Sequence, residues 1–290
     1  MKETNNTQII DNSNLDLVQA FCIFDDIVQI MKWEEKPLGG RPPILSIAEV
    51  CTIILIQKEY NICNIKSLYK LIKTRYNHDF PLGTYKTFNE SLIKYSKFLL
   101  QIVHIIIQIN KAKSGVLTFV DSTSIPVCKI WRASSHKVMK PLANKSKTTI
   151  RWYFGIKLHI ICDEDGNLID LSFTTSTVDD RVPLASFLDR IFGKIVGADG
   201  GYCGQNVIKK AKDTGNIVLA AIRKNMKTIA AKWQGDVLRL RSVVERCFSV
   251  MKTRLNLVTS LPRSINGYLA HYSRCLFMFV FKEWLVIEVK

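Results

Sequence analysis

The sequence predicts an α/β protein in which an all-helical N-terminal region precedes a mixed five-stranded sheet with flanking helices. The 290 residues are 47% hydrophobic, which is enough for one large core or two modest ones. Apolar residues recur at helical spacing up to about residue 113, and the texture changes at Ser114-Gly115. After it, the order is strand, hairpin, helix, strand, helix, strand, helix, which is typical of a layered α/β domain. We therefore predict a helical region over residues 1–113 and an α/β domain over residues 114–290.

Several short helices are expected in the N-terminal region. Ser46 and Glu49 form a capping box ahead of a helix that ends near residue 60, and Asn64 can cap the next helix. A third helical segment begins at Thr84 and carries the basic and aromatic residues Tyr85, Lys86, Lys94 and Lys97. This arrangement suits a helix-turn-helix-like DNA-binding module. The alternative is a plain helical bundle with a solvated lysine face.

Five strands are expected in the C-terminal domain, over residues 116–120, 150–162, 168–175, 194–198 and 217–222. Helices are expected over residues 182–192, with Asp180 as a candidate cap, and over residues 205–212. Asp121 and Asp199 each directly follow an apolar strand. Ligands of open α/β sheets bind at the carboxyl ends of strands, so these two aspartates are candidate site residues.

A single amphipathic helix is expected over residues 237–258, with Asp236 as its cap. Its apolar residues gather on one side at about 100° per residue. The other side carries Arg241, Glu245, Ser249, Lys252 and Asn256. Arg241 and Glu245 are four residues apart, so they could also be an ordinary ion pair on a solvated helix face.

Asp121, Asp199 and Glu245 could form one catalytic site. Carboxylates that converge repel one another, and divalent cations remove that penalty. Hard oxygen ligands suit Mg²⁺ or Mn²⁺, and two such ions about 3.5–4 Å apart can clamp the attacking and leaving oxygens of a phosphoryl transfer. Gly200 and Gly201 would let a phosphate approach the backbone. Taken alone, each aspartate could equally be a turn or capping residue.

The net charge of +16 favours a polyanionic partner, with nucleic acid ahead of an anionic membrane. The stretch between Asp121 and Asp163 contains no acidic residue, and its basic residues include Lys129, Arg132, Lys137, Lys140, Lys145, Lys147 and Arg151. We interpret this stretch as a contact region for DNA phosphates, in which Trp131 and Trp152 could stack on an unpaired base. The alternative is a basic loop without a fixed role.

Cysteine and histidine residues give no sign of a metal or redox centre. The eight cysteines are scattered without a CxxC pair, and His159 lies in an apolar run typical of a core strand. The apolar stretches are shorter than the roughly 20 residues that span a bilayer. We expect a cytoplasmic protein, associated with the nucleoid when bound to DNA, that does not bind a membrane.

Three motifs resemble those of DDE transposases from bacterial insertion sequences, most closely the insertion sequence 982 family. Asp121 lies in FVDST, Asp199 in VGADGGY and Glu245 in RSVVERCFSVMK. The last motif has the spacing Arg, three residues, Glu, six residues, Lys, and it places Leu238 where many relatives have tyrosine. The resemblance covers most of the chain and includes GRPP within Gly39–Pro43.

The resemblance implies an RNase H-like core, two Mg²⁺ ions for which Mn²⁺ substitutes, and DNA cleavage and strand transfer at insertion-sequence ends. It implies double-stranded DNA, both element ends and target, as the partner of a homo-oligomer. Asp121 and Asp199 would share the metals, Glu245 would complete the second metal site, and Lys252 would contact a DNA phosphate. Arg241 would hold Glu245 or another phosphate.

Three other functions are compatible with the sequence. The first is a metal-dependent nuclease with the same fold and no strand transfer, and the second is an inactive DNA-binding protein descended from a transposase. The third, a membrane-surface protein, would need a basic amphipathic helix with a broad apolar face, and no stretch stands out that way.

Overall fold

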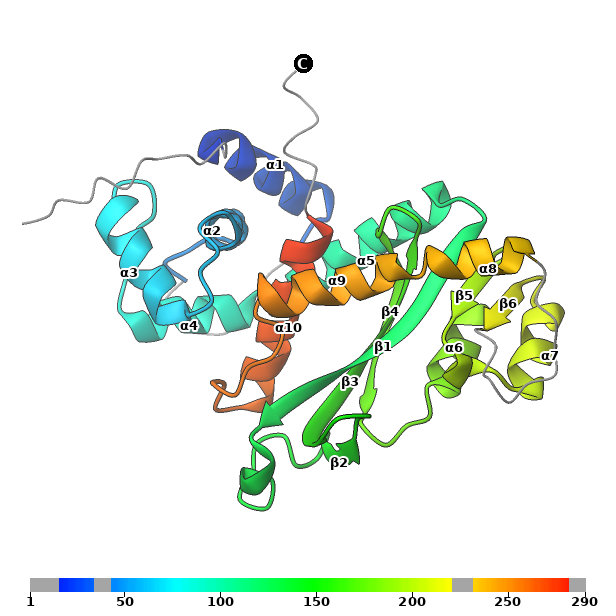
Figure 1. Cartoon of the computed structure of the whole chain (residues 1–290). Helices are drawn as coiled ribbons and strands as arrows, with labels where there is room; N and C mark the ends of the chain where they lie inside the picture. The colour runs from blue at the N-terminus through cyan, green and yellow to red at the C-terminus, as the bar shows by residue number, and fades with distance from the viewer. Residues whose placement is uncertain (1–15, 34–42, 221–231, 282–290) are drawn as a thin grey trace, which may run out of the picture. The chain divides into compact units, whose positions relative to one another are not determined.

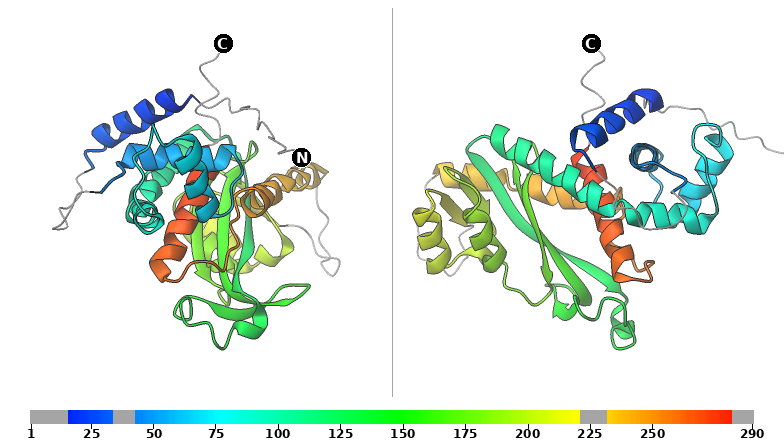
Figure 2. Two further views of the ribbon diagram at one scale, coloured as in Figure 1. Left: turned by 90° about the vertical axis from the view of Figure 1, so that its left-hand side faces the viewer. Right: turned by 180° about the vertical axis from the view of Figure 1, so that it is seen from behind.

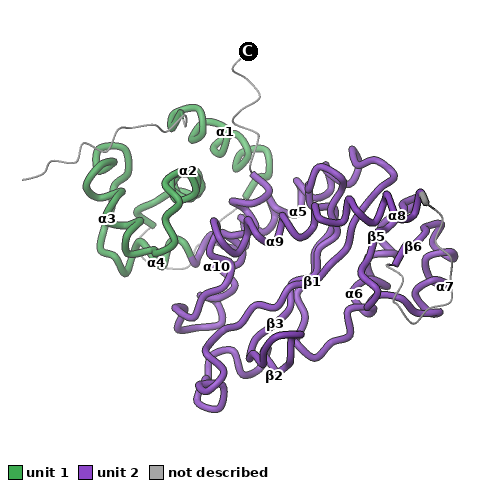
Figure 3. Tube along the Cα trace, viewed as in Figure 1, with its two compact units in different colours: residues 1–92, 283–290 green, residues 93–282 purple. Residues whose placement is uncertain are grey.

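The computed structural model describes residues 16–33, 43–220 and 232–281. The chain divides into two compact units (Figure 3). Unit 1 comprises residues 1–92 and 283–290, and unit 2 comprises residues 93–282. Most of the GRPP motif and the last residues of the predicted fifth strand lie outside the described residues.

Unit 1 contains helices α1 (Leu17–Ile30), α2 (Ile47–Glu59), α3 (Ile65–Arg75) and most of α4 (Tyr85–Lys94) (Figure 1). The predicted capping box is confirmed, because the Glu49 N–H donates to Ser46 Oγ at 3.2 Å and the Ser46 N–H donates to Glu49 Oε2 at 2.6 Å. Asn64 caps α3 as predicted and accepts from the Lys66 N–H at 2.7 Å. Lysines on α3 and α4 are exposed, and DNA binding by this helical pair stays a prediction.

The sheet of unit 2 comprises β1 (Leu117–Cys128), β2 (Asn144–Lys147), β3 (Trp152–Asp163), β4 (Leu168–Thr175), β5 (Ile195–Ala198) and β6 (Ile217–Ala220). The strand order is β4-β3-β1-β5-β6, and the short β2 pairs with the start of β3. β1, β3 and β4 are antiparallel neighbours, whereas β5 and β6 run parallel to β1. This order and these directions are those of an RNase H-like sheet, so the predicted fold class is confirmed. β2 was not among the predicted strands.

Helices cover both faces of this sheet. α6 (Arg181–Leu188) and α7 (Gln205–Asp213) pack on one face, against a fully buried cluster that includes Val120, Ile161 and Val196. α5 (Ser96–Lys113), α9 (Ser242–Thr253) and α10 (Ile265–Val280) contact one another or the strands from the other side. Seen from behind, α5 and α10 cross beside the strands (Figure 2). The Asn110 side chain of α5 donates to the Leu168 carbonyl at 3.1 Å, which ties α5 to β4.

The predicted domain boundary lies between residues 113 and 114, whereas the division into compact units falls after Leu92. α5 belongs to unit 2 because it packs on α10 and β4, and its residues Phe98, Leu99 and Ile102 are buried. The boundary as a functional division stays a prediction.

The first strand is longer than predicted. Asp121 does not end an apolar strand, because β1 continues to Cys128. The reason is tertiary: β3 pairs with β1 as far as Cys128, so the polar residues after Asp121 still find backbone hydrogen-bond partners.

The predicted single helix over residues 237–258 is two helices, α8 (Lys232–Arg239) and α9. Asp236 therefore lies inside α8 and is not a cap, and Glu245 lies in the first turn of α9. The backbone between the two helices is tightened by hydrogen bonds that span three residues. The Leu240 N–H donates to the Val237 carbonyl at 3.1 Å, and the Val244 N–H donates to the Arg241 carbonyl at 3.1 Å. The break turns the exposed Leu240 away from the buried face that the helical pattern assigned to it.

No single helix in the three described ranges is long and apolar enough to cross a membrane, and α4 and α5 meet the length and composition test only as a bent pair.

Gly155 is required by the pairing of β3 with β1, and this gives a first prediction. A Cβ atom at Gly155 would overlap the backbone oxygen of Ile125, whereas a Cβ atom at Gly235 in α8 would meet nothing within 4 Å. Gly155→Ala should lower the free energy of unfolding by about 2–3 kcal/mol because the backbone must shift.

Gly235→Ala is the matched control, and it should raise stability by about 0.5–1 kcal/mol through helix propensity. Thermal unfolding of both variants measures the contrast, and a drop in Tm of roughly 4–10 °C is expected for Gly155→Ala alone. Equal melting temperatures for the two variants would contradict this account of the strand pairing.

Candidate active site

The register of the parallel strands β1 and β5 brings Asp121 and Asp199 to neighbouring positions. Thr118 lies opposite Val196 and Phe119 lies opposite Gly197. Extending this register by two places puts Asp121 opposite Asp199, one residue beyond the end of β5. Neighbouring strands are about 4.8 Å apart, so the two carboxylates share one edge of the parallel part of the sheet. Asp199 begins a short 3₁₀ turn, and its carboxylate accepts from the Gly200 N–H at 2.8 Å.

Arg241 joins the third carboxylate to this pair. Its guanidinium donates from Nη1 to Asp121 Oδ2 at 3.2 Å and from Nη2 to Glu245 Oε1 at 2.8 Å. The side chains of Arg241 and Asp121 are only 21% and 23% exposed, whereas Glu245 is 58% exposed. The reading of Arg241 and Glu245 as an isolated pair on a solvated face is therefore incomplete, because the same guanidinium also pairs with β1. The interruption between helices α8 and α9 places Arg241 where it can reach both carboxylates.

The pKa of Asp121 depends on its own burial and on the charges of the other two carboxylates. Burial, together with the smaller contributions from the charges of Asp199 and Glu245, raises the pKa of Asp121 to about 6. The Ser122 N–H, which donates to Asp121 Oδ1 at 2.8 Å, and the Arg241 guanidinium oppose this rise. The predicted trio thus lies close enough for its members to affect the same titration.

Lys252 and Arg151 form a basic flank beside Asp121. Burial and the charge of Arg151 lower the pKa of the Lys252 ammonium, while the charge of Asp121 raises it. The half-buried Lys252 is therefore near enough to both Asp121 and Arg151 for their charges to affect its titration.

The other predicted DNA-binding residues lie further along the sheet. Lys129 and Arg132 flank or belong to the 3₁₀ turn Ile130–Arg132 after β1, Lys137 and Lys140 lie in the following turns, and Lys145 and Lys147 lie on β2. The segment is ordered by buried Met139 and Ala143 and by the pairing of β2 with β3. It is thus a folded extension of the sheet, and DNA binding by its basic residues stays a prediction.

A polar network beside Asp121 was missed by the sequence analysis. Asp180 makes no capping bond to α6, contrary to the predicted capping role. Its carboxylate instead accepts from Ser122 Oγ at 3.0 Å and from Lys157 Nζ at 2.7 Å. Ser122 and Lys157 lie in the partly buried sheet, where polar groups need hydrogen-bond partners, whereas the backbone N–H groups at a solvated helix end can bond to water. The Asp180 carboxylate therefore bonds to these two side chains. The signal in the sequence was the pair of polar residues Lys157 and His159 at alternate positions of an otherwise apolar strand.

His159 is a core residue, as predicted. Its Nε2 shares a hydrogen bond of 2.8 Å with Thr174 Oγ1, and its Nδ1 lies 4.0 Å from Asp180 Oδ1. Burial lowers the pKa of His159 to about 4, against the opposing charge of Asp180. The imidazole is therefore neutral at pH 7 and contributes a fixed hydrogen bond, not a charge.

The donor set fits a divalent ion by its chemistry, because three carboxylates offer hard oxygen ligands. Within the described ranges, however, no three such side chains are arranged as a ready-made metal group. Arg241 supplies the positive charge between Asp121 and Glu245 in this arrangement. A metal ion bound there would have to share or take over that role.

Comparison with known proteins identifies the family. Residues 111–265, just over half of the chain, match the family described as "Transposase DDE domain". The chain belongs to the DDE transposase family. The matched region of this transposase includes Asp121, Asp199, Glu245 and Lys252.

Solved transposase structures show weaker similarity to this DDE transposase. A piggyBac transposase synaptic complex with hairpin DNA is 10% identical, with a TM-score of 0.49, and the match covers 92% of this chain and 75% of that one. A Mos1 transposase paired-end complex with the left transposon end is 13% identical, with a TM-score of 0.25 and coverage of 83% and 88%. No protein of curated function matches the chain in sequence.

The raised pKa of Asp121 predicts a pH-dependent stability. The ordinary pKa of an unfolded aspartate is about 3.9. Between about pH 4 and pH 6 the folded protein therefore binds more protons than the unfolded chain, so the free energy of unfolding falls as the pH rises. Without added metal, Asp121→Asn should raise stability by about 1–3 kcal/mol at pH 8 and by much less at pH 4.5.

Denaturant unfolding at the two pH values measures this difference. Asp213→Asn, which changes an exposed carboxylate at the end of α7, is the control and should shift stability little at either pH. An equal effect of Asp121→Asn at both pH values would show that the buried charge is not its cause.

Proposed function

We propose that this transposase cleaves and joins DNA at insertion-sequence ends by metal-dependent phosphoryl transfer, with Asp121, Asp199 and Glu245 as its catalytic carboxylates. The supporting observation is that two independent features of the fold bring Asp199 and Glu245 to Asp121. These residues follow Asp121 by 78 and 124 positions in the chain. The β1–β5 register brings Asp199, and the double ion pair of Arg241 brings Glu245.

The DDE family generally uses divalent metal ions. Asp121, Asp199 and Glu245 would hold two Mg²⁺ ions, for which Mn²⁺ would substitute. When bound, such ions lower the pKa of an attacking hydroxyl group and stabilise the charge on the leaving oxygen. Burial makes the ionised form of Asp121 costly in the metal-free protein, and bound cations would stabilise this carboxylate and lower its pKa.

The surrounding residues would position the DNA. Lys252 and Arg151 would bind phosphates beside the carboxylates, since both are basic and their charges act at this site. Arg241 would orient Glu245 and neutralise the site until a metal ion or phosphate binds. Asp180 accepts hydrogen bonds from Ser122 and Lys157 and would thereby fix the part of β1 that carries Asp121.

The partners would be double-stranded DNA at the element ends and at the target, bound by a homo-oligomer in the cytoplasm. The exposed lysines of α3 and α4 suit a role in end recognition. The three sequence motifs and their spacing support assignment to the insertion sequence 982 family.

The role of the carboxylates is tested by Asp199→Asn. This variant should lose DNA cleavage by at least about a hundredfold and keep DNA binding within about threefold, because Asp199 is exposed and makes only a local backbone hydrogen bond. The measurement is cleavage and binding of duplexes made from the DNA that borders the gene, in Mg²⁺ and in Mn²⁺. Asp213→Asn serves as the control, and cleavage by Asp199→Asn at the wild-type rate would refute the assignment.

The same reactions separate a transposase from a nuclease of this fold. Labelled ends should appear covalently joined to a second DNA molecule and not only as nicked strands. Nicks without joined products would support hydrolysis alone, and metal-independent binding without either product would support an inactive DNA-binding descendant.

The basic flank is tested by Lys252→Gln. Loss of one phosphate contact should weaken binding of every duplex to a similar extent and reduce the slope of log affinity against log salt by about 1. Lys209→Gln is the matched control, since Lys209 is an exposed lysine of α7, outside the candidate site. Identical salt slopes for the two variants would exclude a phosphate contact by Lys252.

A further inference from the structure

Unit 2 contains a recess at the far end of β1, away from the three carboxylates. Its volume is about 480 Å³, within the range of roughly 300–1,000 Å³ for small-molecule sites. A recess of this size can hold a nucleotide or two and is too small for a duplex.

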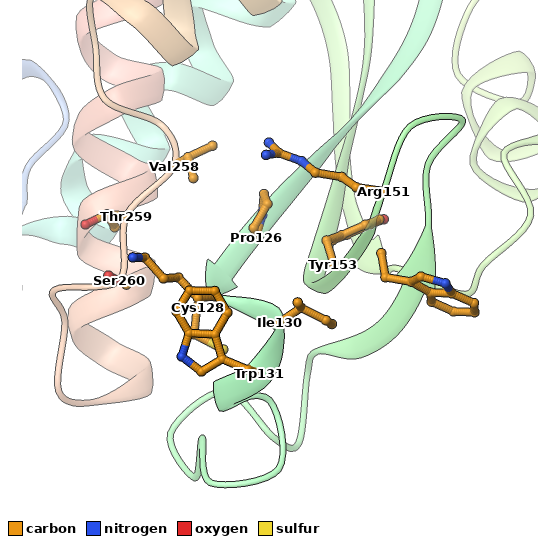
Figure 4. Close-up of a pocket in the computed structure, with 11 residues that line it drawn as sticks. Pro126, Cys128, Ile130, Trp131, Arg151, Tyr153, Val258, Thr259 and Ser260 are labelled. Carbon is orange, nitrogen blue, oxygen red and sulfur yellow. The ribbon is translucent and has the colours of Figure 1, made fainter.

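Three segments distant in the sequence form its walls (Figure 4). Ile130 and Trp131 come from the turn after β1, Arg151 precedes β3, and residues 258–260 come from the loop that follows α9. Trp152, the first residue of β3, also lines the recess.

The aromatic lining is exposed to an unusual degree. Trp131 is 71% exposed and Trp152 is 58% exposed, although both are large side chains that folding normally buries. Lys129 Nζ lies 4.9 Å from the centre of the Trp131 ring, in cation–π geometry. Exposed indole rings beside cations are the elements with which proteins bind single-stranded nucleic acid, because every base offers a flat face for stacking.

The recess is connected to the candidate active site by charge. Arg151 lines the recess, and its charge acts on Lys252, whose pKa also responds to Asp121. Along β1, Pro126 of the recess is five residues from Asp121, which is about 17 Å of extended strand. One strand of DNA covers that distance in roughly five nucleotides.

We propose that this recess binds an unpaired nucleobase of the DNA strand held at the active site, by stacking it on Trp131 and Trp152 while Lys129 and Arg151 bind the adjacent phosphates. The inference rests on the proposed function for the identity of the DNA, but the stacking itself needs no catalysis. A base taken out of its helix a few nucleotides from the cleaved phosphate would fix the position of the DNA end.

The test compares binding of fluorescein-labelled dT15 with binding of a 15-base-pair duplex to the full-length protein, in EDTA, by fluorescence anisotropy. Trp131→Ala and Trp152→Ala should each weaken dT15 binding about tenfold and leave duplex binding within twofold. Trp131→Phe, which keeps an aromatic face, should recover most of the loss. Trp233→Ala removes another exposed tryptophan, in α8, and should change neither affinity.

A second measurement uses a duplex with one bulged 2-aminopurine. Wild-type protein should quench its fluorescence on binding, as stacking on indole requires, and Trp131→Ala should not. Unchanged dT15 affinity in both alanine variants would overturn the proposal, as would an equal loss of duplex binding.

A change in oligomeric state of Trp131→Ala, measured by sedimentation with dT15 affinity intact, would assign the surface to a second copy of the chain and also overturn the proposal. Because these assays contain no metal ion, their failure is distinct from failure of the proposed function, which rests on cleavage and joining by the carboxylates.

Discussion

One guanidinium group joins two carboxylates of the candidate active site. Arg241 pairs with Asp121 on the central strand and with Glu245 on α9, and 120 residues of chain separate the first pair. Both Arg241 and Asp121 are mostly buried, so removing Arg241 would leave the Asp121 charge in a poorly solvated place without its cationic partner. The position of α9 on the sheet, and with it the position of Glu245, depends on this pair as well as on the buried Val244 and Met251.

The site concentrates charge where burial disfavours it. Asp121 lies near an acidic neighbour from the next strand and beside a polar network of Ser122, Lys157 and Asp180, and burial raises its pKa to about 6. Such a carboxylate gains most from an added cation, which is the physical reason to place metal binding at this point of the sheet. The nearby Asp180 and Lys157 neutralise each other's charge, so this pair does not need an added cation.

Much of the architecture could be predicted from local pattern, because strands and helices are specified by apolar periodicity and by caps such as Ser46 with Glu49. The alternation of strand and helix after residue 114 predicted the mixed sheet. The errors lie where long-range pairing overrides the local pattern. β1 extends past Asp121 because β3 supplies partners, and Asp180 binds Ser122 and Lys157 because the fold brings them within reach of its carboxylate.

By itself, the sequence determined the fold class, the three candidate carboxylates and the basic charge of the protein, which favours a polyanionic partner, because residue type, spacing and net charge are local or additive properties. Only the tertiary structure decided that Arg241 joins Asp121 to Glu245, that the helix carrying Glu245 begins after a break, and that Trp131, Trp152 and Arg151 line one recess. These facts concern residues tens of positions apart or more. Their proximity is set by strand register and helix packing, which no single stretch of sequence contains.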